Sequence, residues 1–388
     1  MEASLNLGNG NWATKEDSLL SYSDENGNFR PLPFDFTRGS TATVINKLGL
    51  METVDSGIAR IDFQGTADGS LLLEPASTNK FLYSNDFSEW NTSSESLLIP
   101  NQSGVYQSTT AWKFSNASST TSLYVNNTDS GVQTMSAYFK KNSNNGIRFL
   151  AWGSTNSSAF FNLKDGEVYG TPVNAISAKV TDVGNDWFRC EMTFDHTNTR
   201  CDFYVTNNGS VQVKGEVVIQ LAQLEALPYA TSYIPTDGTI ATRADEVCDG
   251  AGDVTTFNSA EGVLFVEINP LDTGSFKGIG IGQVTGDSLW IYATGVNEIS
   301  AQIRIGGDSQ FYLIDYKIVS DFTKVAFKWA LNDFSLWVNG IEEASSIVGN
   351  LLPANTLQSL QFKVPGASNN FYGKTKQLQV FKTALTDA

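Results

Sequence analysis

Aromatic side chains alternate with amide and guanidinium side chains along several segments of the chain, and this combination suits the recognition of sugars. Aromatic rings stack on the apolar C–H faces of a sugar, while amide and guanidinium groups hydrogen-bond its hydroxyls. In the C-terminal third the candidates are Trp290, Tyr292, Gln302, Arg304, Gln310, Tyr312 and Trp337. In the middle of the chain they are Tyr138, Arg148, Trp152, Tyr204 and Gln220. The same aromatic residues could instead pack against a neighbouring subunit or another domain, so both interpretations stay open.

The spacing of the C-terminal candidates predicts an exposed aromatic patch. Trp290 and Tyr292 lie two residues apart and therefore share one face of one strand. Arg304 lies on a following strand, opposite its isoleucines, and Trp337 alternates with Leu336 and Val338. If these faces coincide, they form a flat platform with a guanidinium group at its edge.

The acidic residues and the single histidine do not support catalysis on sugars. Acid–base chemistry on a glycosidic bond needs two carboxyl groups about 5 to 9 Å apart. Asp62 is isolated, Glu267 has no acidic residue two positions away, and Glu342 follows a turn signal. His196 lies in a polar loop sequence. We therefore expect no catalytic residues, no enzymatic activity and no cofactor.

Metal and nucleotide sites have little support either. With one histidine, three cysteines, no CxxC pair and no DxDxDG loop, the chain lacks the usual zinc and calcium motifs, so no metal is assigned. Cys190 and Cys201 alternate with aromatic and aliphatic residues, which indicates small core residues on inward strand faces. The glycines at 278, 280 and 282 precede no helical pattern and indicate a closely packed strand rather than a phosphate loop.

The elements that carry these residues are expected to be strands. Apolar residues recur at every second position, as in residues 299–305, and no segment shows a capped amphipathic helix. Turn signals separate these segments, because Asx-Gly pairs tolerate the positive φ angles that two-residue hairpins need. The signals are Asn145-Gly146, Asp165-Gly166, Asn208-Gly209 and Asn339-Gly340. The pattern predicts an all-β protein built from antiparallel β-sandwiches.

Composition narrows the function classes. The formal charge of the 388 residues is 25 − 41 = −16, which argues against binding to nucleic acid or to an anionic membrane surface. No run of about 18 apolar residues occurs, so no membrane insertion is expected. The first residues lack a basic segment followed by an apolar one, so we expect no secretory signal peptide.

Shifts in composition suggest five successive segments. Residues 1–36 are polar and rich in Asn and Gly, and we expect an extended N-terminal segment that becomes ordered on a partner. Residues 37–80 form a β connector, 81–228 a first sandwich, 229–250 a turn-rich connector and 251–388 a second sandwich.

Several motifs, in a fixed order, resemble the head or tail fibre and spike proteins of tailed bacteriophages, in particular of phages of marine Bacteroidetes. These motifs are LNLGNGNWA (5–13), FTRGSTAT (36–43), RIDF (60–63), LLLEPASTN (71–79), FSEW (87–90), LAQLE (221–225), ATSYIPT (230–236) and TRAD (242–245). One departure is Ala59, where the family usually has a proline before the arginine of the third motif. The match frames both large blocks of the chain.

Each block also resembles a known kind of domain. TMSAYFK (134–140) and DWFR (186–189) are similar to strands of jelly-roll carbohydrate-binding modules. LWVNG (336–340) and GKTKQLQVF (373–381) are similar to strands of concanavalin A-like and laminin-G-like domains. The resemblance implies two β-sandwiches of the jelly-roll kind after the extended segment.

The resemblance also implies a function, a location and partners. The protein would be a structural component of a phage virion, made in the host cytoplasm and placed on the head or tail surface. Its sandwiches would adhere to host-surface or environmental glycans, and its N-terminal segment would attach to other virion proteins. Fibres and spikes imply a homotrimer, with a dimer as the alternative. A polysaccharide depolymerase of the same fold and a purely structural decoration protein without a ligand are the alternative functions.

Overall fold

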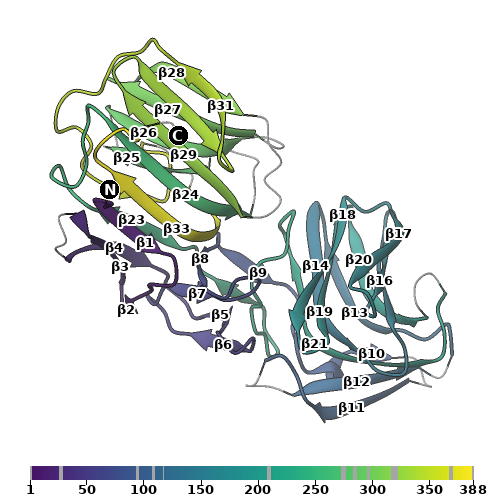
Figure 1. Ribbon diagram of the computed structural model, residues 1–388. Coiled ribbons are helices and arrows are strands. Elements are labelled where there is room, and N and C mark those ends of the chain that lie inside the picture. The colour runs from purple at the N-terminus through teal and green to yellow at the C-terminus, as the bar shows by residue number, and fades with distance from the viewer. Residues whose placement is uncertain are drawn as a thin grey trace. The chain divides into compact units, whose positions relative to one another are not determined.

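The computed structural model consists almost entirely of strands and turns (Figure 1). It describes residues 2–25, 29–92, 96–106, 110–116, 118–207, 211–271, 277–282, 286–294, 298–315, 322–366 and 370–386. Within these ranges, no helix has the length and apolar character needed to cross a membrane. The prediction of an all-β protein is confirmed.

The chain folds into two compact units, neither of which is continuous in sequence. Unit 1 contains residues 1–40, 54–75 and 245–388, and unit 2 contains residues 41–53 and 76–244. The chain therefore passes from one unit to the other after Ser40, Thr53, Pro75 and Ala244. This division differs from the five successive segments expected from composition, because strands distant in sequence pair with one another.

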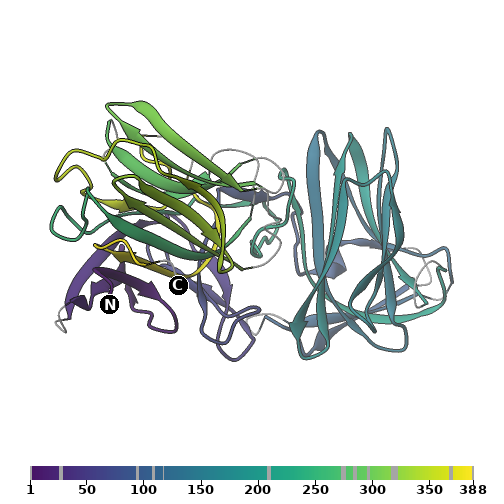
Figure 2. The ribbon, with the colours of Figure 1, turned by 45° about the horizontal axis from the view of Figure 1, so that its top comes forward.

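Unit 2 is a sandwich of two antiparallel six-stranded sheets (Figure 2). The first, which we call the open sheet, has the order β10 (Asn91–Thr92), β13 (Leu123–Asp129), β20 (Asn198–Thr206), β15 (Gly146–Gly153), β16 (Ser157–Asn162) and β17 (Glu167–Val173). The second, the covered sheet, has the order β11 (Ser96–Gln102), β12 (Ala111–Asn116), β21 (Gly215–Glu225), β14 (Val132–Lys141), β19 (Trp187–Asp195) and β18 (Ser177–Gly184). The short pairs β5 (Ala42–Ile45) with β6 (Met51–Val54) and β9 (Ser77–Asn79) with β22 (Ala241–Arg243) accompany them.

The sheets of unit 2 enclose a core in which aromatic residues are prominent. Alternate residues of each strand point inward, and Phe149 contacts both Phe161 and Phe203 there. Cys190 and Cys201 are fully buried in the same core, as their alternation predicted. Successive side chains of a strand point to opposite sides of the sheet. The residues next to each core residue therefore lie on an outer face.

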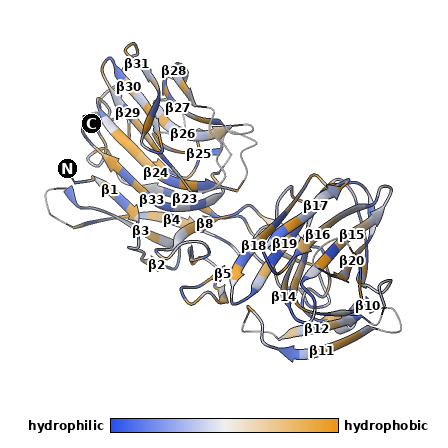
Figure 3. Cartoon of the chain, turned by 45° about the vertical axis from the view of Figure 1, so that its right-hand side comes forward, coloured by the Kyte–Doolittle hydropathy of each residue, from blue (hydrophilic) through white to orange (hydrophobic). Residues whose placement is uncertain are grey.

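Unit 1 is a sandwich formed from one continuous antiparallel ladder that curls back on itself. From end to end the ladder runs β31 (Ile341–Ser346), β30 (Asp333–Val338), β29 (Thr323–Ala330), β24 (Gly262–Pro270), β33 (Gly373–Phe381), β1 (Leu5–Gly8), β3 (Ser18–Ser23), β4 (Arg30–Thr37), β23 (Val247–Ala251), β32 (Leu360–Gln361), β25 (Lys277–Gly282), β26 (Ser288–Thr294), β27 (Glu298–Ile305) and β28 (Asp308–Asp315). Hydrophobic and hydrophilic residues alternate along many of its strands (Figure 3). Three short strands extend the ladder at its margins. β2 (Thr14–Lys15) pairs with β3, β8 (Ser70–Leu73) pairs with β33, and β7 (Arg60–Asp62) pairs with β8.

The N-terminal residues belong to this sandwich, which corrects the expectation of a separate extended segment. β1 pairs with β33, four residues against four, and Ser4 donates its backbone N–H to Val380. Leu5, Leu7 and Leu19 are buried in the unit 1 core, together with residues of β24 and β33. A polar composition concealed these strands because only some of their residues face the core, and because the β33 partner of β1 lies more than 350 residues away.

Candidate functional site

The outer face of the open sheet carries a continuous group of aromatic and arginine side chains. On β15, Phe149 and Ala151 point into the core, so Arg148 and Trp152 point outward. On β20, Cys201 and Phe203 point inward. We call the outward set the aromatic–arginine face: Tyr124, Arg148, Trp152, Phe160, Tyr169, Arg200, Asp202 and Tyr204.

The strand register places one row of this face across four strands. Tyr204 of β20 lies opposite Arg148 of β15, which lies opposite Phe160 of β16, and Phe160 lies opposite Tyr169 of β17. The guanidinium carbon of Arg148 is 5.3 Å from the Phe160 ring centre and 5.7 Å from that of Tyr204. The Arg148 side chain is thus held between two aromatic rings, within the range of a cation–π contact.

A second row lies four residues further along the strands, beyond the pair of Leu150 and Asp202. Arg200 of β20 lies opposite Trp152 of β15 and opposite Asn126 of β13. Its guanidinium carbon is 5.2 Å from the Trp152 ring centre and 4.6 Å from that of Tyr124. Trp152 keeps 36% of its surface exposed, so its ring is available to a ligand.

Asp202 fixes the position of Arg200. One carboxylate oxygen accepts a hydrogen bond from Arg200 Nε at 2.8 Å, and the other accepts one from Ser122 Oγ at 2.7 Å. The Asp202 side chain is fully buried, and this burial raises its pKa, although both hydrogen bonds oppose the shift. Burial acts against the charge of Arg200, but the hydrogen bond and charge of Asp202 outweigh it and raise the pKa of Arg200.

Arg148 has a different environment. Its Nε atom is buried without a hydrogen-bond partner, and no ion pair or hydrogen bond joins its side chain to another described residue. Burial lowers the pKa of Arg148, and the nearby Tyr204 and Asp202 only partly oppose this shift. The face therefore contains one arginine with a carboxylate partner and one without.

This arrangement can bind a sugar. Trp152 and Tyr169 offer partly exposed rings, with 36% and 48% of their surfaces accessible, for stacking on C–H faces. The two guanidinium groups supply planar, oriented hydrogen-bond donors for hydroxyl or acidic groups. Of the predicted sugar contacts, Arg148, Trp152 and Tyr204 lie on this face, and Arg148 contacts Tyr204.

Several residues of this face were missed from the sequence, although Tyr204 was singled out. The run from Arg200 to Tyr204 alternates polar and apolar residues, which could have indicated that its odd and even positions lie on opposite faces. The sequence did not show that β13, β16 and β17 belong to the same sheet as β15 and β20. The missed residues are Tyr124, Phe160, Tyr169, Arg200 and Asp202.

The outer face of the covered sheet is not available to a ligand at the predicted position. Tyr138 retains only 3% exposure and belongs to a second hydrophobic cluster of unit 2, with Met51, Tyr106 and Tyr233 among its members. The guanidinium carbon of Arg189 lies 5.5 Å from its ring centre. Tyr138 is therefore a packing residue, because segments distant in sequence cover its face.

Gln220 of the same sheet is also a structural residue. Its side chain is fully buried, and its amide oxygen accepts a hydrogen bond from the Val105 backbone N–H at 2.8 Å. Its amide nitrogen donates to the Tyr106 carbonyl at 3.1 Å. Gln220 therefore fixes the segment that precedes β12 and offers no contact to a sugar.

The predicted aromatic platform of unit 1 is not exposed. Trp290 and Tyr292 share one face of β26, as their spacing predicted, but each retains only 2% exposure and packs with Val364. The neighbouring strand allows this close packing, because a Cβ atom on Gly280 would lie 2.5 Å from Pro365 Cδ. The sequence indicates which face these residues share, but not that a later segment covers it.

The remaining candidates of β27 and β28 lie beside this buried pair, because Gln302 lies opposite both Trp290 and Tyr312. The guanidinium carbon of Arg304 lies 5.0 Å from the Trp290 ring centre, and the Gln302 amide donates to Ser309. Tyr312 keeps 42% exposure and donates its hydroxyl to Glu298. The amide oxygen of Gln310 accepts a hydrogen bond from the Asn350 side chain at 2.9 Å.

Trp337 lies on another part of the ladder. Its strand, β30, pairs with β29 and β31, whereas β26 pairs with β25 and β27. Leu336 and Leu289 both enter the shared core, so Trp337 and Trp290 point away from that core on different layers. The condition for a combined patch, that these faces coincide, is not met.

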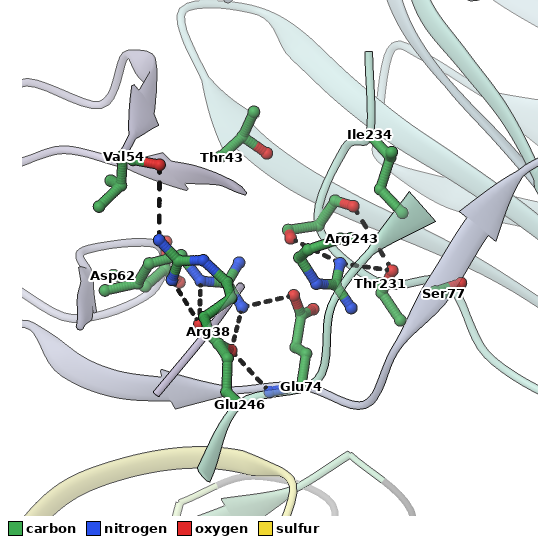
Figure 4. A network of polar contacts seen from close by, with 12 residues as sticks. Arg38, Thr43, Val54, Asp62, Glu74, Ser77, Thr231, Ile234, Arg243 and Glu246 are labelled. Carbon is green, nitrogen blue, oxygen red and sulfur yellow. Dashed lines mark hydrogen bonds and ion pairs between the residues drawn. The ribbon is translucent and has the colours of Figure 1, made fainter. Parts of the chain in front are cut away.

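Three of the sequence motifs supply residues to a buried ionic network in unit 1. Glu246 accepts a hydrogen bond from Arg38 at 2.7 Å (Figure 4). It accepts another from Arg60 Nε at 2.9 Å, and Arg60 also pairs with Glu74 at 2.8 Å. Burial opposes the charge of Arg60, but the two carboxylates outweigh it and raise the pKa of Arg60. Every partner of this network is buried, so the network is closed to solvent.

Motif residues of unit 2 behave in the same way. Glu225 accepts hydrogen bonds from Ser77 Oγ at 2.6 Å and from the Thr231 backbone at 2.9 Å. Arg243 donates to Thr231 Oγ1 at 3.0 Å and to Ser232 Oγ at 3.1 Å (Figure 4). The motifs that carry the family resemblance therefore have structural roles.

No metal-binding group is formed by the described residues. No three His, Cys, Asp or Glu side chains within that part of the chain lie close enough to hold an ion. His196 lies in the turn between β19 and β20, where it is buried and 4.9 Å from the Phe194 ring, measured between ring centres.

No known family model matches the chain, and no curated protein matches its sequence. Similar solved structures include the CBM40 domain of the Ruminococcus gnavus IT-sialidase bound to α2,3-sialyllactose, with 16% identity, a TM-score of 0.31 and coverage of 36% of this chain and 89% of that chain. Mouse laminin α1 domains LG4-5 match with 10% identity, a TM-score of 0.25 and coverage of 81% and 92%.

A phage protein is also among the similar structures. The tail fibre protein gp63.1 of an E. coli phage matches with 7% identity, a TM-score of 0.23 and coverage of 82% of this chain and 41% of that chain. At such TM-scores, these similarities carry no argument about ligand or assembly. Any functional conclusion must therefore come from the residues of this chain.

Proposed function

We propose that the protein is a glycan-binding adhesion protein and that unit 2 binds the glycan through the aromatic–arginine face. The observation that carries the proposal is the arrangement of Trp152, Arg200 and Asp202. A partly exposed indole lies beside a guanidinium group whose position is fixed by a buried carboxylate. This arrangement places a stacking surface beside oriented hydrogen-bond donors, the combination that suits a sugar.

The proposed setting is the surface of a phage virion, in a head or tail fibre or spike. The support is the ordered set of sequence motifs, whose residues form the two buried networks. We also propose that the protein attaches to other virion proteins. We no longer assign this attachment to residues 1–36, because β1, β3 and β4 belong to the unit 1 sandwich.

Self-association belongs to the same proposal. A homotrimer would present three faces, and multivalency would make a weak site, with a binding free energy of about −4 kcal/mol, useful on a cell surface. Light scattering tests the oligomer: a mass near 42.2 kDa at micromolar concentration would rule out self-association of the isolated chain.

The binding proposal is tested with Trp152→Ala and a matched variant, Tyr312→Ala, which removes an aromatic ring of similar exposure from unit 1. Retardation of the full chain in gels containing host-surface polysaccharide measures the affinity. We expect Trp152→Ala to weaken binding at least about tenfold, as for a central aromatic contact, and Tyr312→Ala to leave it unchanged. Equal binding by both variants would place the site elsewhere.

The same experiment separates the alternative functions. Release of oligosaccharides from the polysaccharide would indicate a depolymerase. The absence of any retardation, for every host polysaccharide tested, would favour a decoration protein without a ligand. Retardation without cleavage is the result that our proposal requires.

A further inference from the structure

The two arginines of the aromatic–arginine face differ in a way that bears on the kind of ligand. The charge of Arg200 is balanced by Asp202 at 2.8 Å. Arg148 makes no ion pair or hydrogen bond with the part of the chain that the structure describes, although its side chain is half-buried between Phe160 and Tyr204. A partly buried charge without a partner is costly, and a ligand that supplies the opposite charge recovers that cost.

The position of Arg148 is suited to this role. Two aromatic rings hold its guanidinium group, so a ligand would find the donors already oriented. Arg148 and Trp152 lie an even number of residues apart on β15, so both belong to its outward face and to one binding surface. A guanidinium group pairs with carboxylate or sulfate through two parallel hydrogen bonds.

We propose that the aromatic–arginine face recognises an acidic sugar, whose carboxylate or sulfate group pairs with Arg148. This inference rests on the proposed glycan-binding function and specifies its ligand class. Trp152 and Arg200, whose position Asp202 fixes, would contact the neutral part of the glycan. The chain carries a formal charge of −16, so the selection depends on this short-range pairing and not on long-range attraction.

The test compares acidic glycans with their neutral counterparts. A panel of oligosaccharides with uronic acid, sialic acid or sulfate groups is presented to the full chain, together with the carboxyl-reduced or desulfated form of each. We expect the wild-type chain to bind at least one acidic member roughly tenfold more tightly than its neutral form, the lower end of the range for charge-assisted hydrogen bonds. Loss of the preference on carboxyl reduction would identify a carboxylate as the group that is recognised, and loss on desulfation would identify a sulfate.

Two variants assign the preference to Arg148. Arg148→Gln should reduce binding of the acidic member roughly tenfold while changing binding of its neutral form less than about twofold. Lys179→Gln is the matched control: it removes one exposed positive charge from β18, on the covered sheet, and should leave both affinities unchanged.

The outcomes separate the two proposals. Equal or tighter binding of the neutral forms by the wild-type chain would overturn the acidic preference while leaving glycan binding in place. A preference that persists in Arg148→Gln would overturn the role of this arginine. Failure to bind the panel and the host polysaccharide would overturn the proposed function itself.

Discussion

At the residue scale, the same substitution should have different consequences at the two arginines. Asp202 accepts hydrogen bonds from Arg200 and Ser122, and Arg200→Gln removes the first of them from a buried carboxylate. We therefore expect this substitution to lower the free energy of unfolding by about 1–3 kcal/mol. Arg148→Gln deprives no described residue of a hydrogen bond or ion pair. We expect it to change the free energy of unfolding by less than about 1 kcal/mol, the size of a cation–π contact. Urea denaturation at pH 7 measures both.

The pH dependence of this difference has a definite sign. Burial raises the pKa of Asp202, so the carboxyl group takes up a proton at a higher pH than an ordinary aspartate. Once protonated it no longer requires a cation. The penalty of Arg200→Gln should therefore shrink as the pH falls through that pKa, and a penalty that grows on acidification would contradict this account.

Trp290 and Tyr292 show how far residue patterns can predict a site. Their alternation correctly indicated that they share one face of a strand. It did not indicate their exposure, because the covering contact comes from Val364, more than 70 residues later. Arg148 and Trp152 were predicted as analogous candidates, and Trp152 keeps 36% of its surface exposed.

At the element scale, local turn chemistry predicted some connections well. Asn339 and Gly340, with φ angles of 52° and 83°, form the two-residue turn between β30 and β31. Asp165-Gly166 similarly precedes β17, which pairs with β16. Asn145-Gly146 instead connects β14 and β15, which belong to different sheets, and Asn208-Gly209 lies outside the described residues. A turn signal fixes the local backbone but not the partner of the strand that follows.

Strand β1 provides a test of the element that composition concealed. Leu7 is 2% exposed in the unit 1 core, so Leu7→Ala should lower the free energy of unfolding by about 2–5 kcal/mol. Lys15→Ala, at an exposed position of β2, is the control and should change it by less than about 0.5 kcal/mol. Similar denaturation midpoints for the two variants would show that the N-terminal residues lie outside the core.

At the scale of the whole molecule, the motifs and the site have separate roles. The motif residues Arg38, Arg60 and Glu74 form a buried network in unit 1, whereas the aromatic–arginine face lies on unit 2. The motifs could be recognised in the sequence because each is a short continuous segment. The binding face could not, because it is assembled from β13, β20, β15, β16 and β17 by long-range pairing.

The most direct test of the central claim is a hydroxyl-radical footprint of the full chain with and without the polysaccharide that it binds. The oxidation of individual aromatic side chains is read by mass spectrometry. Our account predicts that Trp152 and Tyr169 become protected when the glycan is present, while Tyr312 is oxidised to the same extent in both samples. Protection of Tyr312 with unchanged oxidation of Trp152 and Tyr169 would contradict it.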